Sequence, residues 1–428
     1  MLPDEKRSVQ ASASRPRWGL LRFFVAGMLC FHLLFFANLR KRVEQGYPDF
    51  TIFYTAATML RSGLGHQLYD EHVQFEVQRE FVGPIPSRLG ALPYNHPPFE
   101  ALIFIPLTFL RYPRAFAVWD LLNVVALFGV AFLLRRFVNA LRLIPPWEFV
   151  ALSLAFFPVF ACLLQGQDSI LQLLLCALGF NALTREEDFL AGCWFALAMF
   201  KFQLIIPLVV LIVIWKRRRV ALGFGAVSLL LVLLSMGLVG WEGALGYPAF
   251  AMRADTAQNL GAVPAALMPN LRGIVEGWSF GSARGVMQIF LITSSLALLV
   301  FVVWKTQPVG TEQFGLQFSL VTVVALLLGW HTNAHDLCLL ILPLVLIADY
   351  CLHALAAERG RKLLLLLPAL PILIGPFWIA LWLRYGKVNL MAIPLLWWGW
   401  EIGREISRAS GLTTHGSPRA KPSSLDSV

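Results

Sequence analysis

Asp49 is the carboxylate in this sequence that is best placed to act as a general base. It lies in the stretch YPDFTIFYTAATMLRSGLGHQLYD, between a long apolar segment and an aromatic-rich amphipathic run. A carboxylate beside a bound hydroxyl can accept its proton while the hydroxyl oxygen attacks a carbon atom. Aspartate is also a preferred N-cap residue, so Asp49 could instead cap a helix that begins at Phe50. The sequence leaves both roles open.

Lys201, His331 and His335 add further polar groups to apolar surroundings. Lys201 interrupts the apolar residues 189–215, and the two histidines stand four residues apart in the turn HTNAHD. The lysine can bind an anionic group such as phosphate, or it can be a satisfied cation that holds a turn. Four-residue spacing would put the histidines on one helical face, although histidines often only satisfy local hydrogen bonds. Because no third ligand stands at zinc-site spacing, we predict no metal centre and no cofactor, with a divalent ion not excluded.

The composition predicts an integral membrane protein. Of the 428 residues, 58% are hydrophobic and 14% are charged, and the mean hydropathy is +0.68. Several apolar runs reach the ~20 residues with which a helix crosses ~30 Å of hydrocarbon, and they lack the period-two alternation of β-barrel strands. The expected fold class is therefore all-α, a polytopic membrane helical bundle.

The net charge of +10 does not indicate a nucleic-acid partner. Lysine and arginine cluster at the ends of apolar segments, as at residues 135–136, 216–219 and 359–362. The positive-inside rule accounts for this pattern, so the expected partner is the lipid bilayer. The six cysteines lie within apolar runs and form no Cys-x-x-Cys pair, which is typical of small buried hydrophobic residues rather than disulfides or metal ligands.

Three parts of the chain are expected. Residues 1–17 would be a cytoplasmic N-terminal tail, residues 18–404 the transmembrane domain, and residues 405–428 a disordered cytoplasmic tail. Residues 18–39 should be a retained first helix with its N-terminus inside, because no small-residue cleavage site follows them. Both termini are then cytoplasmic in a multi-pass protein of the plasma (inner) membrane.

The first outer loop, residues 40–112, is too polar to span a membrane and too apolar to be a plain linker. Residues 50–60 and 73–81 predict two short amphipathic helices, separated by a break at Gly63 and Gly65. We expect these helices, and a short apolar segment after them, to lie at the outer membrane interface.

Alternating the remaining segments gives about twelve membrane segments. Residues 189–215 would form a hairpin of two short helices that turns near Lys201, since charged loops flank both of its ends. Residues 240–285 would form a second outer loop, and residues 166–169 and 331–336 would form outer turns. This topology brings the unusual polar side chains to the outer face, where their convergence suggests one site. The substrate-binding candidates there are Tyr54, Tyr94, His96, Gln167, Asp168, Lys201, Arg253, Asn270, Arg272, His331 and Asp336.

Such a site suits the transfer of a sugar from a lipid-linked phosphate. The reaction needs a base near the acceptor hydroxyl, and cations or hydrogen-bond donors that hold the phosphate as it leaves. A phosphate leaves readily, so a single carboxylate can suffice, unlike the paired carboxylates of glycoside hydrolysis. Asp49 is the candidate base, and Lys201, Arg253, Arg272 and the histidines are candidates for the phosphate.

Several segments, taken in order, resemble glycosyltransferase family 87. They are PDFTIFYTAATMLRSGLGHQLYD, YNHPPFEALIFIPLTFL, LLQGQDSILQLLLCAL, AGCWFALAMFKFQLIIPLVVL followed by KRRR, MPNLRGIV and HTNAHDLCLLILPL. That family comprises integral membrane enzymes of GT-C architecture, typified by polyprenyl-phosphate-mannose-dependent mannosyltransferases. The resemblance covers roughly residues 20 to 400 and rests on the order and spacing of the segments.

The resemblance implies an inverting hexosyltransferase that uses a polyprenyl-phosphate sugar donor on the extracytoplasmic side. Its catalytic residues would be Asp49, from the DFxxxY stretch, and His335, from the late outer turn; the acceptor would be a glycolipid or glycan. Gly166 and Gln167 match the family's Gly-Gln-x-Asn pattern, but the following residues depart from it. Asp168 is then a possible second functional carboxylate, and the departure weakens an assignment of the sugar as mannose.

Two other classes of protein remain as alternatives. A transporter or flippase for a lipid-linked sugar would use the same groups for binding, but it would place polar residues on both sides of the midplane and often show inverted repeats. A membrane scaffold without a site would have these polar groups dispersed. The polar bias toward one face favours the transferase.

Overall fold

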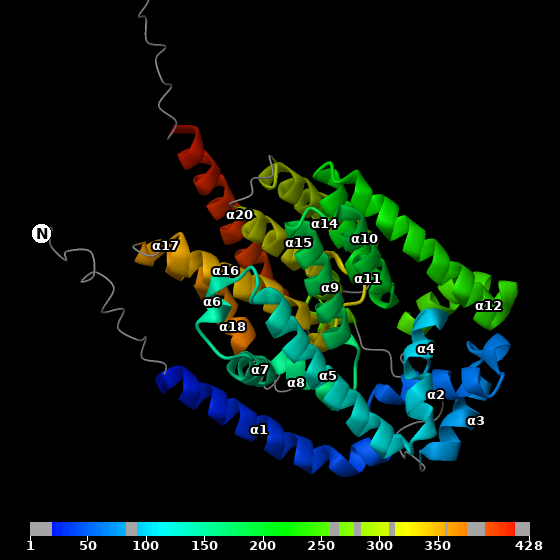
Figure 1. The fold of residues 1–428 in the computed structure, drawn as a ribbon. Helices are drawn as coiled ribbons and strands as arrows, with labels where there is room; N and C mark the ends of the chain where they lie inside the picture. Colours follow the sequence, from blue (N-terminus) through cyan, green and yellow to red (C-terminus); the bar gives the residue numbers. More distant parts are fainter. Residues whose placement is uncertain are drawn as a thin grey trace, which may run out of the picture.

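The structure of the protein is a computed structural model that describes residues 19–82, 92–256, 265–277, 284–307, 313–355, 358–374 and 390–415. Within these ranges every regular element is a helix (Figure 1). The predicted all-α class is therefore confirmed for the part of the chain that the structure describes. The expected N-terminal tail, residues 1–17, lies outside the described residues.

Five helices in the described ranges are long and apolar enough to cross a membrane, or up to seven if each of two bent pairs counts as one span. The five segments are Leu21–Arg42, Tyr112–Leu134, Arg218–Arg253, Gly285–Lys305 and Ala334–His353. The bent pairs are Pro146–Ala155 with Phe157–Gln165, at 79°, and Asp188–Leu197 with Met199–Ile214, at 64°. This agrees with a multi-pass helical membrane protein, while the total of about twelve segments stays a prediction.

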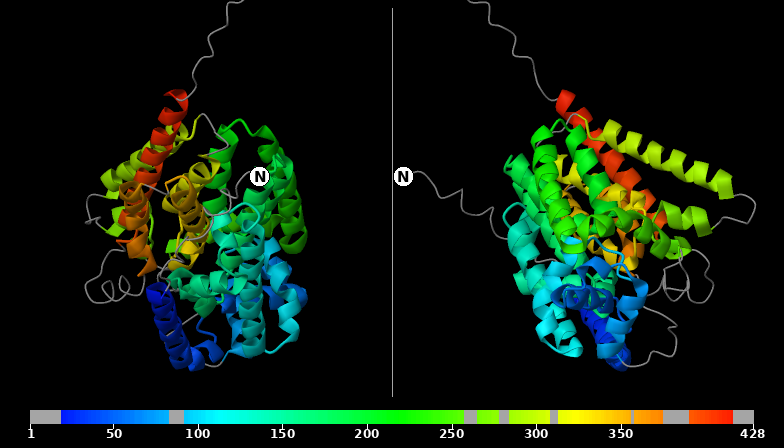
Figure 2. Two further views of the ribbon diagram at one scale, coloured as in Figure 1. Left: turned by 60° about the vertical axis from the view of Figure 1, so that its left-hand side comes forward. Right: turned by 90° about the vertical axis from the view of Figure 1, so that its right-hand side faces the viewer.

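The region after α1 (Gly19–Glu44) contains the two short helices expected there. They are α2 (Phe50–Arg61) and α3 (Glu71–Phe81). Gly63, in the turn between them, has a φ of +77°, a conformation that glycine adopts without steric cost. The side chain of Asp70 caps α3 by accepting hydrogen bonds from the backbone of His72 and Val73. In every view α2 and α3 lie at the end of the molecule opposite the C-terminal end of α20 (Figures 1 and 2).

Three helices, α9 (Ser169–Thr184), α11 (Phe202–Ile214) and α15 (Phe314–Leu328), connect two chemically different ends of the bundle. At the end we call the basic end, Arg217 binds Asp188 at 2.6 Å and its guanidinium lies 5.3 Å from the Phe314 ring centroid. At the other end, which we call the site end, Lys201 contacts the first residue of α9. The bundle therefore separates a basic end from a polar site by the length of these helices.

The chain reverses at Lys201. Helix α10 (Asp188–Leu197) leads into the short helix η4 (Met199–Lys201) and then α11. The contact between Arg217 and Asp188 brings the far ends of α10 and α11 back together at the basic end. This return agrees with the expected hairpin and favours a re-entrant loop over a broken span.

Helix α12 (Arg218–Thr256) crosses the bundle beside α10 and then bends. A Cβ at Gly192 of α10 would lie 2.1 Å from the Val220 carbonyl oxygen, so the absence of a side chain permits this close packing. At Gly240 the backbone is not helical, with φ +76°, and the second half of α12 packs on η1 (Gly65–Gln67) and η2 (Pro98–Glu100). The expected outer loop at 240–285 thus begins with helix.

The C-terminal helix α20 (Ala392–His415) is longer than predicted. The expected disordered tail began at residue 405, but the helix continues to His415. Glu405 is buried there, accepts a hydrogen bond from Tyr350 and pairs with Arg361, which holds this turn against the bundle. Residues 416–428 lie outside the described part of the chain.

The other helices complete the bundle around this frame. They are α4 (Ala101–Phe104), η3 (Ile105–Phe109), α5 (Tyr112–Leu134), α6 (Asn139–Arg142), α7 (Pro146–Ala155), α8 (Phe157–Gln165), η6 (Ala265–Leu267), α13 (Leu271–Gly277), α14 (Arg284–Lys305), η9 (Ala334–Leu340), α16 (Ile341–His353), α17 (Arg359–Leu366), η10 (Leu367–Ala369) and α18 (Leu370–Leu373).

Candidate active site

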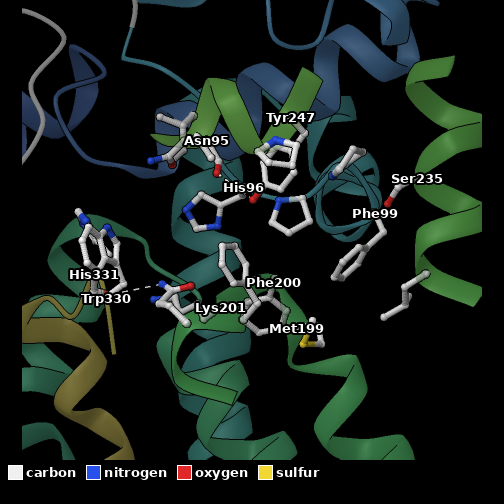
Figure 3. A pocket seen from close by; sticks show the side chains of 18 of the residues that line it. Asn95, His96, Phe99, Met199, Phe200, Lys201, Ser235, Tyr247, Trp330 and His331 are labelled. Carbon is white, nitrogen blue, oxygen red and sulfur yellow. Dashed lines mark hydrogen bonds between the residues drawn. The ribbon is translucent and has the colours of Figure 1, made fainter. Parts of the chain in front are cut away.

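A cavity of about 830 Å³ opens at the site end. Its walls come from the start of α2, the segment before η2, the loop between α8 and α9, the Lys201 turn, α12 and the turn before η9. Figure 3 shows side chains from several of these elements around the same space. Among the predicted site residues, Asp49, His96, Gln167, Lys201, His331, His335 and Asp336 line the cavity.

Asp49 is held by two glutamines, Gln165 at the end of α8 and Gln167 in the loop that follows. Gln167 Nε2 donates a hydrogen bond of 2.8 Å to Asp49 Oδ2, and the Asp49 backbone N–H donates to Gln165 Oε1 at 3.2 Å. The side chain of Asp49 makes no capping hydrogen bond to α2, although it occupies the N-cap position. The N-cap explanation is therefore wrong for its carboxylate, because that carboxylate is drawn across to Gln167.

The loop that carries Gln167 depends on a glycine. Gly166 ends α8 in the left-handed conformation, with φ +60°, and a Cβ there would lie 2.7 Å from both Phe116 and Phe50. The Gln167 carbonyl accepts a hydrogen bond from Trp119 Nε1 at 3.3 Å. These contacts fix the glutamine that orients Asp49.

Lys201 is the centre of a buried ionic network. Its ammonium lies 2.8 Å from Asp168 Oδ1 and 2.5 Å from Asp336 Oδ1, and it donates to Ser169 Oγ at 2.7 Å. All three charged side chains are nearly inaccessible, at 3% exposure or less. This geometry supports the interpretation of Lys201 as a satisfied cation that holds the hairpin turn, since two carboxylates already surround it.

The turn before η9 presents two histidines differently from expectation. His331 lies in coil ahead of η9, and His335 lies within that 3₁₀ helix, so the idea of one shared helical face is wrong. Asp336 Oδ2 accepts the backbone N–H of Asn333 at 2.7 Å in a capping box, and this fixes the turn. His335 Nε2 lies 3.6 Å from Asp336 Oδ1, and both histidines still line the cavity.

Glu100 is a buried acid that the sequence reasoning did not select. It is fully buried, and His96 Nδ1 lies 2.8 Å from its Oε2. Burial, and then the charge of Asp168, raise the pKa of Glu100 well above its ordinary value. Burial would also raise the pKa of Asp168, but Lys201 outweighs it and lowers that pKa. Burial lowers the pKa of His96 to about 4, so this imidazole is neutral near pH 7. A glutamate inside an apolar segment was the signal that could have identified Glu100.

Other predicted residues lie beside the cavity rather than on its wall. Asn270 donates to the Gly329 carbonyl at 2.7 Å, and the Arg272 guanidinium lies 4.2 Å from the Trp330 ring centroid. These two residues support the turn that carries His331. Tyr94 is buried behind His96 and donates to the Pro97 carbonyl.

Two predicted residues are farther from the chemistry. The Tyr54 hydroxyl donates to the Leu110 carbonyl at 2.8 Å, and its ring packs against Phe81 and Tyr112 in the core between α2 and α5. Arg253 is exposed near the end of α12 and does not line the cavity. The structure therefore does not bring Tyr54 or Arg253 to the cavity wall.

An apolar side of the cavity was also missed. It is formed by exposed hydrophobic residues of α11 and α12, namely Phe202, Ile206, Val232 and Met252. Apolar residues within long apolar segments all look alike in the sequence, so no local signal separates these from neighbours that face lipid or core.

Residues 94–329 of the chain match the family described as glycosyltransferase family 87. The matched range contains Gln167, Lys201 and Asn270, whereas Asp49 and His335 lie outside it. Comparisons with curated proteins and with solved structures found no match.

Proposed function

Because the chain belongs to glycosyltransferase family 87, whose members are GT-C-type glycosyltransferases, we propose that it transfers a hexose from a polyprenyl-phosphate donor to an acceptor hydroxyl. The acceptor would be a glycan or glycolipid, and mannose is one candidate for the hexose. The observation that carries the proposal is the position of Asp49, a carboxylate oriented by Gln167 on the wall of a large cavity.

In the proposed step, Asp49 acts as the general base. The acceptor oxygen attacks the anomeric carbon of the sugar, and its proton passes to the Asp49 carboxylate. The bond from that carbon to the phosphate oxygen breaks, and polyprenyl phosphate leaves with the electron pair. A single in-line displacement inverts the configuration at the anomeric carbon. Only Oδ2 of Asp49 accepts a side-chain hydrogen bond among the described residues, so Oδ1 can receive the proton.

The phosphate would be held by the polar side of the cavity. His331 and His335 line this side, and Arg272 lies behind it against Trp330. We assign the contact with the departing phosphate to His331 and His335, whose N–H groups can stabilise the charge that develops there, and Arg272 would add its positive charge from behind the wall. Arg253 would act at the rim. Lys201 would act through its charge and by positioning Gln167, since its nitrogen already has several oxygen partners.

The donor's hydrocarbon chain fits the other side of the cavity. Phe202, Ile206 and Val232 line the cavity and remain accessible, with relative exposures from 38% to 54%. In a membrane such surfaces contact lipid. The cavity therefore has a polar side suited to a sugar phosphate and an apolar side that can admit a polyprenyl chain from the bilayer.

The proposed orientation puts the site end on the extracytoplasmic face of the plasma membrane. Arg185, Lys216 and Arg217 belong to turns near the other end, where Arg217 donates to the Leu183 carbonyl. The positive-inside rule assigns such an end to the cytoplasm. The cytoplasmic placement of both termini follows the same rule and is part of the proposal.

The test incubates purified protein with a panel of polyprenyl-phosphate hexoses and acceptor glycolipids and measures released polyprenyl phosphate. Asp49→Asn should insert and fold normally but lose transfer by a factor of about 10² to 10⁴, the usual contribution of a general base. Asp70→Asn is the matched control, because Asp70 only caps α3 and asparagine caps equally well. Full activity of Asp49→Asn would exclude Asp49 as the base. Binding of a donor by the wild type without release of polyprenyl phosphate would favour the transporter.

A further inference from the structure

Three side chains at the site end converge without completing their hydrogen bonds. One ligand atom each from His96, Glu100 and Asp168 lies within 4.8 Å of the others. His96 and Glu100 stand four residues apart at η2, whereas Asp168 precedes α9. Local spacing therefore pairs His96 with Glu100, and the fold brings Asp168 to them.

Their oxygens are buried and incompletely satisfied. Glu100 is 0% exposed and Asp168 is 1% exposed. Apart from the proton that Glu100 and Asp168 can share with each other, Glu100 Oε1 and Asp168 Oδ2 have no hydrogen-bond partner among the described residues. Buried polar atoms are nearly always paired, so two oxygens with no other partner in one buried cluster with His96 need an explanation.

We propose that His96, Glu100 and Asp168 bind a divalent cation. One imidazole nitrogen and two carboxylate oxygens form a donor set that suits Zn²⁺ or Mn²⁺. The cation would supply the missing partner of both unpaired oxygens. The sequence-based expectation was no metal centre, with a divalent ion not excluded, and it considered the histidines and the cysteines but not His96, Glu100 and Asp168.

The charged groups around the three ligands are compatible with a bound cation. Lys201 lies 2.8 Å from Asp168 Oδ1, which leaves Oδ2 as the oxygen available for a metal. Lys201 is also paired with Asp336. Its single positive charge therefore faces two carboxylates, those of Asp168 and Asp336. Without a cation Glu100 keeps its proton, and a divalent cation would replace that proton, because a carboxyl group binds a metal ion in its ionised form.

Metal binding would also define the role of His96 in the cavity. Its Nδ1 is the nitrogen beside Glu100, and the residue lines the cavity. A metal on Nδ1 fixes the tautomer in which Nε2 carries the hydrogen, so His96 becomes a hydrogen-bond donor. This consequence rests on the proposed sugar-phosphate substrate, whereas the metal site itself does not.

The experiment measures metal binding directly, without the transfer assay. Full-length protein in detergent is stripped with chelator, and then Mn²⁺ binding is followed by electron paramagnetic resonance and Zn²⁺ content by mass spectrometry. We expect one bound ion per chain with magnetic coupling to a single imidazole nitrogen. If the wild-type protein binds no ion, or binds an ion that shows no coupling to nitrogen, the proposal is wrong. This measurement needs only the wild-type protein, so it does not depend on whether any variant folds.

Variants locate the ion. Glu100→Gln and Asp168→Asn keep the shape of each side chain and should weaken Mn²⁺ binding about tenfold or more. Glu76→Gln, at an exposed position of α3, should bind like the wild type. Wild-type affinity in both site variants would place the ion elsewhere and contradict the assignment. Because binding is read without a sugar donor, failure of this proposal and failure of the proposed transferase activity are distinguishable.

Discussion

The Lys201→Met substitution tests whether the buried ionic network holds the site together. Lys201 faces the carboxylates of Asp168 and Asp336 at 2.8 and 2.5 Å, and each of these acids is about 1% exposed. Methionine fills a similar volume but leaves two carboxylates without their cation. Removing one partner of a buried ion pair destabilises a protein by about 3–5 kcal/mol, because the remaining charge is neither solvated nor paired.

The assay is equilibrium unfolding in mixed micelles with a denaturing detergent, followed by tryptophan fluorescence. Lys201→Met should lower the free energy of unfolding by about 3–5 kcal/mol. Lys216→Met is the matched control: Lys216 is exposed at the start of the basic turn, so its replacement should change stability by less than about 0.5 kcal/mol.

A double variant separates charge from packing. Lys201→Met combined with Asp168→Asn leaves one buried carboxylate instead of two, so its loss should be smaller than the sum of the two single losses. Additive losses would show that the ion pair is not the source of the effect. A Lys201→Met protein as stable as the wild type would refute the interpretation of Lys201 as the cation that holds the hairpin turn.

Three further predictions follow from the structure at the site end. Gln167→Leu removes the hydrogen bond to Asp49 Oδ2 and should slow sugar transfer about tenfold or more at unchanged folding; a variant with wild-type turnover would contradict the positioning role. Gly166→Ala places a Cβ against Phe50 and Phe116 at a φ of +60° and should lower the free energy of unfolding by about 2–4 kcal/mol in the same assay. Gly225→Ala is the control, because no atom lies near its Cβ position, and it should not lower that free energy. Burial raises the pKa of Tyr69 well above its ordinary value of 10, so on raising the pH the unfolded state loses the phenolic proton before the folded state does. The free energy of unfolding should therefore fall as pH rises above 10, and Tyr69→Phe should reduce this fall. A Tyr69→Phe variant with the wild-type pH profile would contradict the assignment of the effect to Tyr69.

Part of the site was predictable because an ionisable residue within an apolar segment usually has a structural or functional role. Asp49, Lys201 and Asp336 stand out against their neighbours, and burying an ionisable group costs enough that such groups are usually paired or face a cavity. The same reasoning would have included Glu100, which lies in an apolar stretch and is fully buried. It overvalued Tyr54, because an aromatic residue in an amphipathic helix looks the same whether its ring enters a cavity or the core.

The sequence by itself determined the class of protein: long apolar segments ended by arginine and lysine specify membrane helices, because hydrocarbon accepts only backbones that satisfy their own hydrogen bonds. It also made Asp49 a candidate base. Only the tertiary structure decided what Asp49 does locally, since the partner that draws its carboxylate away from α2 is Gln167, 118 residues along the chain. The approach of Asp168 to His96 and Glu100, and the pairing of Lys201 with Asp336, likewise depend on how the helices pack, because contacts across long sequence separations leave no local pattern.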